Sequence, residues 1–228
     1  MPQKRRRTKQ KLKTQKNKMT NKIKIPFIWS EYKNFSGADI NIFSKEVNGD
    51  SKGFDVTGIV KVVEGDSKGF DVTGIYKEVN GDSKGFDVTG FGKVVEGNSK
   101  GFDVTGFGKV VEGNSKGFDV TGFGKVVEGD SKGFDVTGIA KIVYGNSKGA
   151  SVTGGVNYSK GVKDFLIQYG TLANIIKEVP EDAFVLQVGL YNKAGEQYRP
   201  ILNIKGIKNL PKIFKSSFKK SKLEEKLK

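Results

Sequence analysis

Carboxylates and ammonium groups recur through this sequence at a fixed interval of sixteen residues. One column comprises Asp55, Asp71, Asp87, Asp103, Asp119 and Asp135, and the next comprises Lys61, Lys77, Lys93, Lys109, Lys125 and Lys141. A carboxylate beside an ammonium group could transfer protons, but a catalytic pair should differ from its surroundings. Each of these pairs has close copies on either side, so the pattern favours a structural role for the charges.

The chain contains no Cys and no His. Their absence excludes disulfides, zinc–thiolate sites and cysteine nucleophiles, and it removes the commonest general base. The Gly-Asp-Ser-Lys-Gly segments lack the spacing of a phosphate-binding loop. We therefore expect a protein that is not an enzyme, with no catalytic residues, cofactor, metal or small-molecule substrate. Hydrolysis by carboxylates is the enzymatic alternative.

The charges belong to a tandem repeat, clearest as GNSKGFDVTGFGKVVE over residues 97–112. Eight copies fill residues 33–160, and they begin at Lys33, Gly49, Gly65, Gly81, Gly97, Gly113, Gly129 and Gly145. A strict period indicates a repeat architecture. Within the copy quoted, a turn precedes a strand over 99–105, and Gly106 separates it from a second short strand.

Alternation along the first strand divides its side chains between two faces, with Phe102 and Val104 on one and Asp103 and Thr105 on the other. The apolar face is expected to point inward. The resulting core columns are Phe54, Val56, Phe70, Val72, Phe86, Val88, Phe102, Val104, Phe118, Val120, Phe134 and Val136.

The second strand is expected to add Phe107 and Val111 to this core, but Lys109 lies between them on the same parity. Either the chain bulges or arches at Gly108, or the Lys stem follows the core edge and its ammonium group reaches solvent. The Asp and Lys columns are expected outside, as stripes of opposite charge that cancel much of their own repulsion.

Two all-β architectures fit such units. In a β-solenoid each copy is one coil, and equivalent residues stack in the ladder direction. In an antiparallel meander each copy is a hairpin unit, and pairing across the Gly81–Asp82 turn places Phe70 opposite Lys93. That register mixes apolar and charged residues on both faces, whereas the solenoid keeps like with like. The solenoid is therefore the preferred fold and the meander the alternative.

The segments on either side of the array differ from it in composition. Residues 25–32 carry the only Trp and are expected to cap the first coil, and residues 161–204 are expected to continue the solenoid as degenerate repeats. There Gln168 takes the place of Asp55 and Asn174 the place of Lys61, with a loop at 180–182. Residues 1–24 are expected to be a disordered basic arm, and residues 205–228 a basic, helical tail.

The net charge of +15 lies in these two tails. Residues 1–24 contain eleven basic side chains and no acid, and residues 205–228 contain nine Lys and two Glu. Such runs attract membrane lipid or nucleic acid by releasing counterions. The candidate anion-binding residues are Lys4, Arg5, Arg6, Arg7, Lys9, Lys11, Lys212, Lys215, Lys219, Lys220 and Lys222.

The sequence thus favours a non-enzymatic scaffold or surface-interaction module attached to an anionic partner, with a nucleic-acid-associated protein as the alternative. Binding to a protein partner is a further possibility that the sequence leaves open. Neither a transmembrane helix nor a secretory signal peptide is expected, because no apolar run has the required length or position. These features do not specify the cellular location, and a cytoplasmic location is the default expectation.

The degenerate repeats contain a motif in which Gln precedes Gly and then Asn, as at Gln168, Gly170 and Asn174, and again at Gln187, Gly189 and Asn192. This motif resembles the glycine-rich short-tandem-repeat proteins of bacterial surfaces, whose coils read Gly-Leu-Gln-Ile-Gly-Leu-x-Asn. The match is clearest over 161–204 and weaker over 33–160, where Asp and Lys replace Gln and Asn. The resemblance implies a β-repeat fold and a cell-surface setting, and it offers no catalytic residues.

Overall fold

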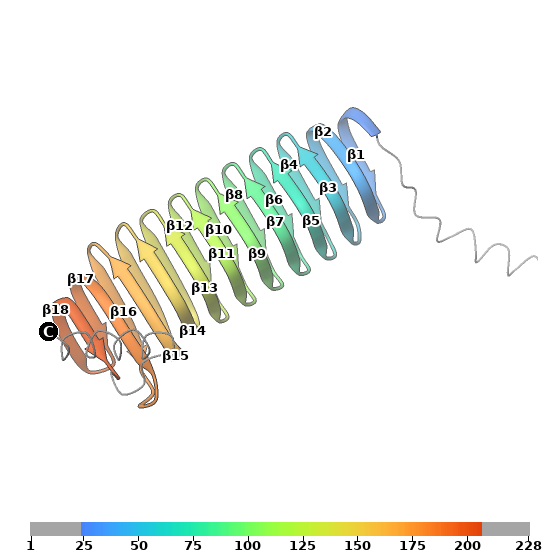
Figure 1. Ribbon diagram of the computed structural model, residues 1–228. Coiled ribbons are helices and arrows are strands. Elements are labelled where there is room, and N and C mark those ends of the chain that lie inside the picture. The colour runs from blue at the N-terminus through green and yellow to red at the C-terminus, as the bar shows by residue number, and fades with distance from the viewer. Residues whose placement is uncertain (1–23, 207–228) are drawn as a thin grey trace, which may run out of the picture.

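The computed structural model describes residues 24–206, which form one long rod of β-strands (Figure 1). Within this range there is no helix with the length and apolarity needed to cross a bilayer. The strands are β1 (Lys24–Tyr32), β2 (Phe35–Val47), β3 (Ser51–Thr57), β4 (Val60–Val63), β5 (Ser67–Thr73), β6 (Tyr76–Val79), β7 (Ser83–Thr89), β8 (Gly92–Val95), β9 (Ser99–Thr105), β10 (Gly108–Val111), β11 (Ser115–Thr121), β12 (Gly124–Val127), β13 (Ser131–Thr137), β14 (Ala140–Thr153), β15 (Val156–Gly170), β16 (Ala173–Glu178), β17 (Phe184–Ala194) and β18 (Gln197–Lys205).

Each sixteen-residue repeat forms one coil of a parallel β-solenoid. Its long strand, such as β9, pairs with β7 of the preceding coil and β11 of the following coil, and its short strand β10 pairs with β8 and β12. Every residue aligns with its equivalent in the next coil, for example Asp103 with Asp119. The rod has about ten turns. The predicted solenoid is confirmed, and parallel pairing rules out the meander for the array.

Glycine allows the coils to approach one another closely. Gly101 has a φ of +138°, a conformation that residues with a side chain rarely adopt. A Cβ atom on Gly106 would lie 1.8 Å from the carbonyl oxygen of Gly90 in the preceding coil. The chain turns from the long to the short strand at Gly106 and Phe107. The predicted break at Gly106 is therefore confirmed, whereas both explanations offered for Lys109 are wrong: β10 starts at Gly108 with no register shift, and the Lys109 side chain is buried.

This close approach gives a paired prediction. Gly106→Ala should lower the free energy of unfolding by about 2 kcal/mol or more, because the coils must separate to admit the methyl group. Gly108→Ala is the matched control, since its Cβ would meet nothing closer than the Gly124 carbonyl oxygen at 3.9 Å. We expect the control to stay within about 0.5 kcal/mol of the parent in urea denaturation. Equal losses in both variants would contradict the close approach at Gly106.

The interior of the coils is polar, which corrects the predicted core. Ser99, Asp103 and Thr105 of β9 and Lys109 and Val111 of β10 are each at most 3% exposed. The predicted core columns lie on the outer surface and contain no buried residue: Phe54, Val56, Phe70, Val72, Phe86, Val88, Phe102, Val104, Phe118, Val120, Phe134 and Val136. Of the four apolar side chains expected inside each array coil, only the one at the Val111 position is internal.

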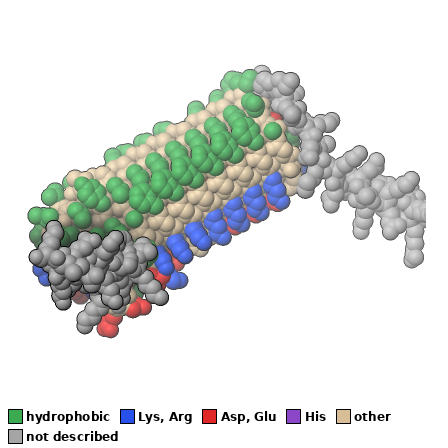
Figure 2. Space-filling model, in the orientation of Figure 1, with side chains coloured by type: hydrophobic (Ala, Val, Ile, Leu, Met, Phe, Trp, Pro, Cys, Tyr) green, Lys and Arg blue, Asp and Glu red, His purple; other side chains and the backbone are tan. Residues whose placement is uncertain are grey.

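On the outer surface, the aromatic side chains of successive coils stack on one another. Rings of successive coils in the Phe102 column are parallel, with centroids 4.8–5.3 Å apart. A second stack at the turn joins Phe91, Phe107 and Phe123, with centroids 4.7 Å apart. Apolar rows consequently run along the rod, with a charged row at one edge (Figure 2). Ring–ring contact between coils recovers part of the apolar burial that the interior does not supply.

The degenerate coils follow the predicted alignment. Ser151 pairs with Gln168 and Asn157 with Asn174, in continuation of the Asp and Lys columns. Residues 179–183 connect β16 to β17 outside the strands, in agreement with the expected loop. The last strand differs from the expectation, because β18 pairs antiparallel with β17 and so returns as a hairpin instead of adding a coil.

Candidate functional site

Seven aspartates and seven lysines alternate in a single row through the interior of the rod. We call this row the Lys–Asp ladder, and it comprises Asp39, Lys45, Asp55, Lys61, Asp71, Lys77, Asp87, Lys93, Asp103, Lys109, Asp119, Lys125, Asp135 and Lys141. Except at the C-terminal end, each Lys bridges the Asp of its own coil and the Asp of the next coil. The Nζ atom of Lys61 lies 2.8 Å from Asp55 Oδ2 and 2.8 Å from Asp71 Oδ1.

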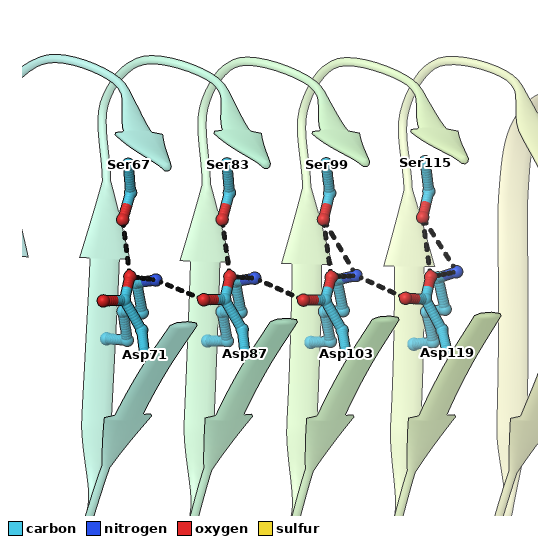
Figure 3. A network of polar contacts seen from close by, with 12 residues as sticks. Ser67, Asp71, Ser83, Asp87, Ser99, Asp103, Ser115 and Asp119 are labelled. Carbon is cyan, nitrogen blue, oxygen red and sulfur yellow. Dashed lines mark hydrogen bonds and ion pairs between the residues drawn. The ribbon is translucent and has the colours of Figure 1, made fainter. Parts of the chain in front are cut away.

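Serine hydroxyls complete the coordination of the carboxylates. Ser67 Oγ donates a hydrogen bond to Asp71 Oδ2 at 2.6 Å, and the same bond recurs in the following coils (Figure 3). Lys109 Nζ also donates to Ser99 Oγ at 3.1 Å. Each ladder carboxylate of this region therefore accepts from one hydroxyl and two ammonium groups. The Thr hydroxyls beside the ladder, such as Thr105 Oγ1 and Thr121 Oγ1, are buried without a protein hydrogen-bond partner.

The charges hold one another in their ionised forms. Burial alone would raise the pKa of the Asp103 carboxyl, but the ammonium groups of Lys109 and Lys93 outweigh burial and hold that pKa well below its usual range. Burial alone would lower the pKa of the Lys93 ammonium group, and the neighbouring carboxylates instead raise it. Lys141, with Asp135 as its one ladder partner, has a pKa lowered by burial.

This arrangement suits structure better than proton transfer. General acid–base catalysis needs a group whose pKa lies near the working pH, whereas Asp103 and Lys93 keep their charges across the neutral range. Removing charges from water is costly, and a buried ion pair offsets that cost only when its partners are well placed. The ladder meets this condition, because each of its buried charges has at least one partner of opposite sign within hydrogen-bonding distance.

The C-terminal end of the ladder passes into neutral side chains. Ser151 and Asn157 replace Asp and Lys in the same coil, so no charge is left without a partner. Beyond them the row consists of amides, in which Asn157 Nδ2 donates to Asn174 Oδ1 at 2.9 Å. Gln187 Nε2 likewise donates to Gln168 Oε1 at 2.9 Å.

The N-terminal end is closed by aromatic side chains. Phe35 occupies the position that Ser holds in later coils, and the Lys45 ammonium group lies 3.1 Å from the centre of its ring. Tyr32 of β1 donates to Asp39 Oδ2 at 2.8 Å. Burial and the Asp39 carboxylate together raise the pKa of Tyr32 to about 12. Tyr32 belongs to the segment 25–32 that is expected to cap the first coil; within that segment β1 pairs in parallel with β2, while the Trp29 side chain is 56% exposed.

The structure leaves some predicted site residues untested. All the candidate anion-binding residues fall in residues 1–23 or 207–228 and lie outside the described part of the chain. Among residues 24–206, no group of three or more acidic side chains is arranged to hold a metal ion. Comparison with family models, curated proteins and solved structures gives no match for this chain.

Proposed function

We propose that the protein is a non-enzymatic scaffold, a stiff rod that displays the same outward side chains at regular intervals and attaches to an anionic partner through its basic ends. The observation that carries this proposal is the Lys–Asp ladder. It commits the interior Asp and Lys side chains of the array to contacts within and between coils. The outward residues are left as repeated rows, which suit contact with an extended surface better than capture of a single substrate.

The attachment is supported by the distribution of charge. The ladder is neutral, with seven acids and seven bases, whereas residues 1–24 contain eleven basic side chains and no acid. A chain with this layout should bind anionic surfaces through its ends and should lose affinity as salt rises.

A bacterial surface setting is the finer part of the proposal, and it rests on the resemblance to glycine-rich short-repeat proteins. The residues that carry the resemblance, Gln168, Asn174, Gln187 and Asn192, are buried and hydrogen-bonded to one another along the rod. The Gln and Asn of the motif thus form a row of hydrogen-bonded amides inside this rod. If the surface proteins share this coil, their Gln and Asn residues should form the same internal row.

Flotation of the full-length chain with vesicles tests the attachment. We expect binding to vesicles with anionic lipid, no binding to neutral vesicles, and a loss of about tenfold or more when Lys4, Arg5, Arg6, Arg7, Lys9 and Lys11 are changed to Gln. The matched control changes six rod lysines to Gln: Lys52, Lys68, Lys84, Lys100, Lys116 and Lys132. If only this control lost vesicle binding, the rod lysines and not residues 1–24 would be the site of attachment. Binding of duplex DNA but of no vesicle would favour the nucleic-acid alternative. Binding of neither would contradict the proposed attachment to an anionic partner.

A further inference from the structure

The two broad sides of the rod carry different rows of side chains. We call the outer side of the long strands the Phe face. Its three rows are Lys52, Lys68, Lys84, Lys100, Lys116 and Lys132; Phe54, Phe70, Phe86, Phe102, Phe118 and Phe134; and Val56, Val72, Val88, Val104, Val120 and Val136. We call the outer side of the short strands the Gly face. Its rows are built mainly from Glu64, Glu96, Glu112 and Glu128; Val62, Val94, Val110 and Val126; and Gly92, Gly108 and Gly124.

The charged rows are incompletely paired within the molecule. Lys68 and Lys84 each lie 2.9 Å from an Asp at the preceding turn, but Asn98 and Asn114 occupy that place before Lys100 and Lys116. Among residues 24–206, Lys100, Lys116, Glu112 and Glu128 form no ion pair. Like charges stacked at the ladder spacing repel. A Lys row and a Glu row therefore each lack counter-charges in the middle of the rod.

The order of the rows is the same on both faces. Each long strand runs from the Asn or Asp turn towards Gly106 and its equivalents, and the short strand runs back, while Lys109 reaches Asp103 across the interior. The Phe row of the long strands consequently lies across the interior from the outward Val row of the short strands. In the same way, the Lys row and the Glu row lie along the same edge of the rod. A second rod of the same orientation, laid against the first, would bring opposite charges together along that edge.

We propose that the rods of this protein stack laterally, with the Phe face of one copy on the Gly face of the next. In this arrangement Lys100 faces Glu112, Phe102 faces Val110 and Val104 faces Gly108. Large side chains meet small ones, and the repeats match because both rods have the same ladder spacing. Since the two faces differ, every stack ends with one free Phe face and one free Gly face, so it stays open and can add copies at either end. This inference concerns the rod alone and does not depend on the proposed attachment.

The exposed area is sufficient for such contact. Phe54, Phe70, Phe118 and Phe134 are 36–44% exposed, and the array presents apolar rows over its whole length (Figure 2). The three rows together are about 20 Å wide, and over the six coils that carry the Phe row, at about 4.8 Å each, they cover roughly 580 Å² on each partner, or about 1,150 Å² in total. A specific interface should bury about 1,000 Å² or more in total.

Charge reversal tests the stacking by sedimentation velocity of the full-length chain. We expect the parent to form oligomers that grow with concentration. The K100E/K116E variant places Glu against Glu, and the E112K/E128K variant places Lys against Lys, so each should associate at least about tenfold more weakly than the parent. An equimolar mixture of the two variants, and the variant carrying all four changes, should each recover association.

The recovery distinguishes stacking from a general effect of charge. All four substituted side chains are exposed. An unchanged melting curve by circular dichroism would show that the variants keep the fold. A parent that stays monomeric at every concentration would overturn the proposal, as would variants that do not recover in the mixture. Flotation of a monomeric parent with lipid vesicles through Lys100 and Lys116 would assign the Phe face to a membrane instead.

Discussion

Replacing Lys109 by Asn is expected to lower the free energy of unfolding by about 3 kcal/mol or more. The ammonium group lies between Asp103 and Asp119, and its loss leaves one excess negative charge in the interior. The exposed Lys100 of the same coil is the matched control, and Lys100→Asn should change stability by no more than about 0.5 kcal/mol. Guanidinium or urea denaturation of the two variants measures the difference.

The same experiment has a compensating variant that the chain itself suggests. In the coil with Ser151 and Asn157 both ladder partners are replaced together. Changing Asp103→Ser together with Lys109→Asn should therefore cost about 2 kcal/mol less than the sum of the two single changes, since the remaining charges balance. Additive losses, or a Lys109→Asn loss no larger than that of Lys100→Asn, would contradict the ladder as a paired system.

Acid should destabilise the fold steeply, while neutral and moderately alkaline solutions should not. Asp71, Asp87, Asp103, Asp119 and Asp135 have folded-state pKa values held below the ordinary value by the ladder lysines. Their contribution to stability is present above the unfolded pKa of about 3.9 and is lost as pH falls towards the folded pKa. The unfolded chain then binds protons that the folded chain does not.

The alkaline limit follows from the ladder lysines whose pKa values are raised, and their effect on stability has the opposite dependence on pH. The pKa values of Lys61, Lys93 and Lys125 are raised, so their contribution is complete below the unfolded pKa of about 10.4 and is lost as pH rises through the folded pKa. Denaturation midpoints should therefore form a plateau between about pH 5 and about pH 10.

The test is the slope of stability against pH on the acid side. The Asp103→Ser, Lys109→Asn variant lacks one ladder carboxylate, so it should take up fewer protons on unfolding and show a shallower slope than the parent. A parent midpoint that does not change between about pH 6 and about pH 3 would contradict the account.

The solenoid itself could be predicted from the sequence because it depends on the period. A strict repeat makes equivalent residues stack, and the register of Asp103 on Asp119 follows from that alone. The alignment of Gln168 and Asn174 with the Asp and Lys columns could be found for the same reason. The antiparallel return of β18 could not, since nothing in its composition distinguishes a returning strand from another coil.

The orientation of the strand faces was predicted wrongly. Alternation divides Phe102 and Val104 from Asp103 and Thr105, but it does not show which pair faces inward. The preference for burying apolar residues selects Phe and Val, because the first strand considered alone contains an Asp without its counter-charge. The compensating ammonium groups come from the second strand and from the neighbouring coil. Two signals were available: Lys109 shares its parity with Val111, and Asp and Lys are replaced together at Ser151 and Asn157.

Cysteine accessibility measures the inverted interior most directly, because the chain contains no natural Cys. Thr121 is 1% exposed and its hydroxyl has no hydrogen-bond partner, whereas Phe123, two residues later at the turn, is 45% exposed. In the native protein we expect Phe123→Cys to react with a thiol reagent at nearly the rate of the unfolded chain, and Thr121→Cys to be protected until unfolding. Rapid labelling of Thr121→Cys with protection of Phe123→Cys would place the apolar face inside and contradict the polar interior.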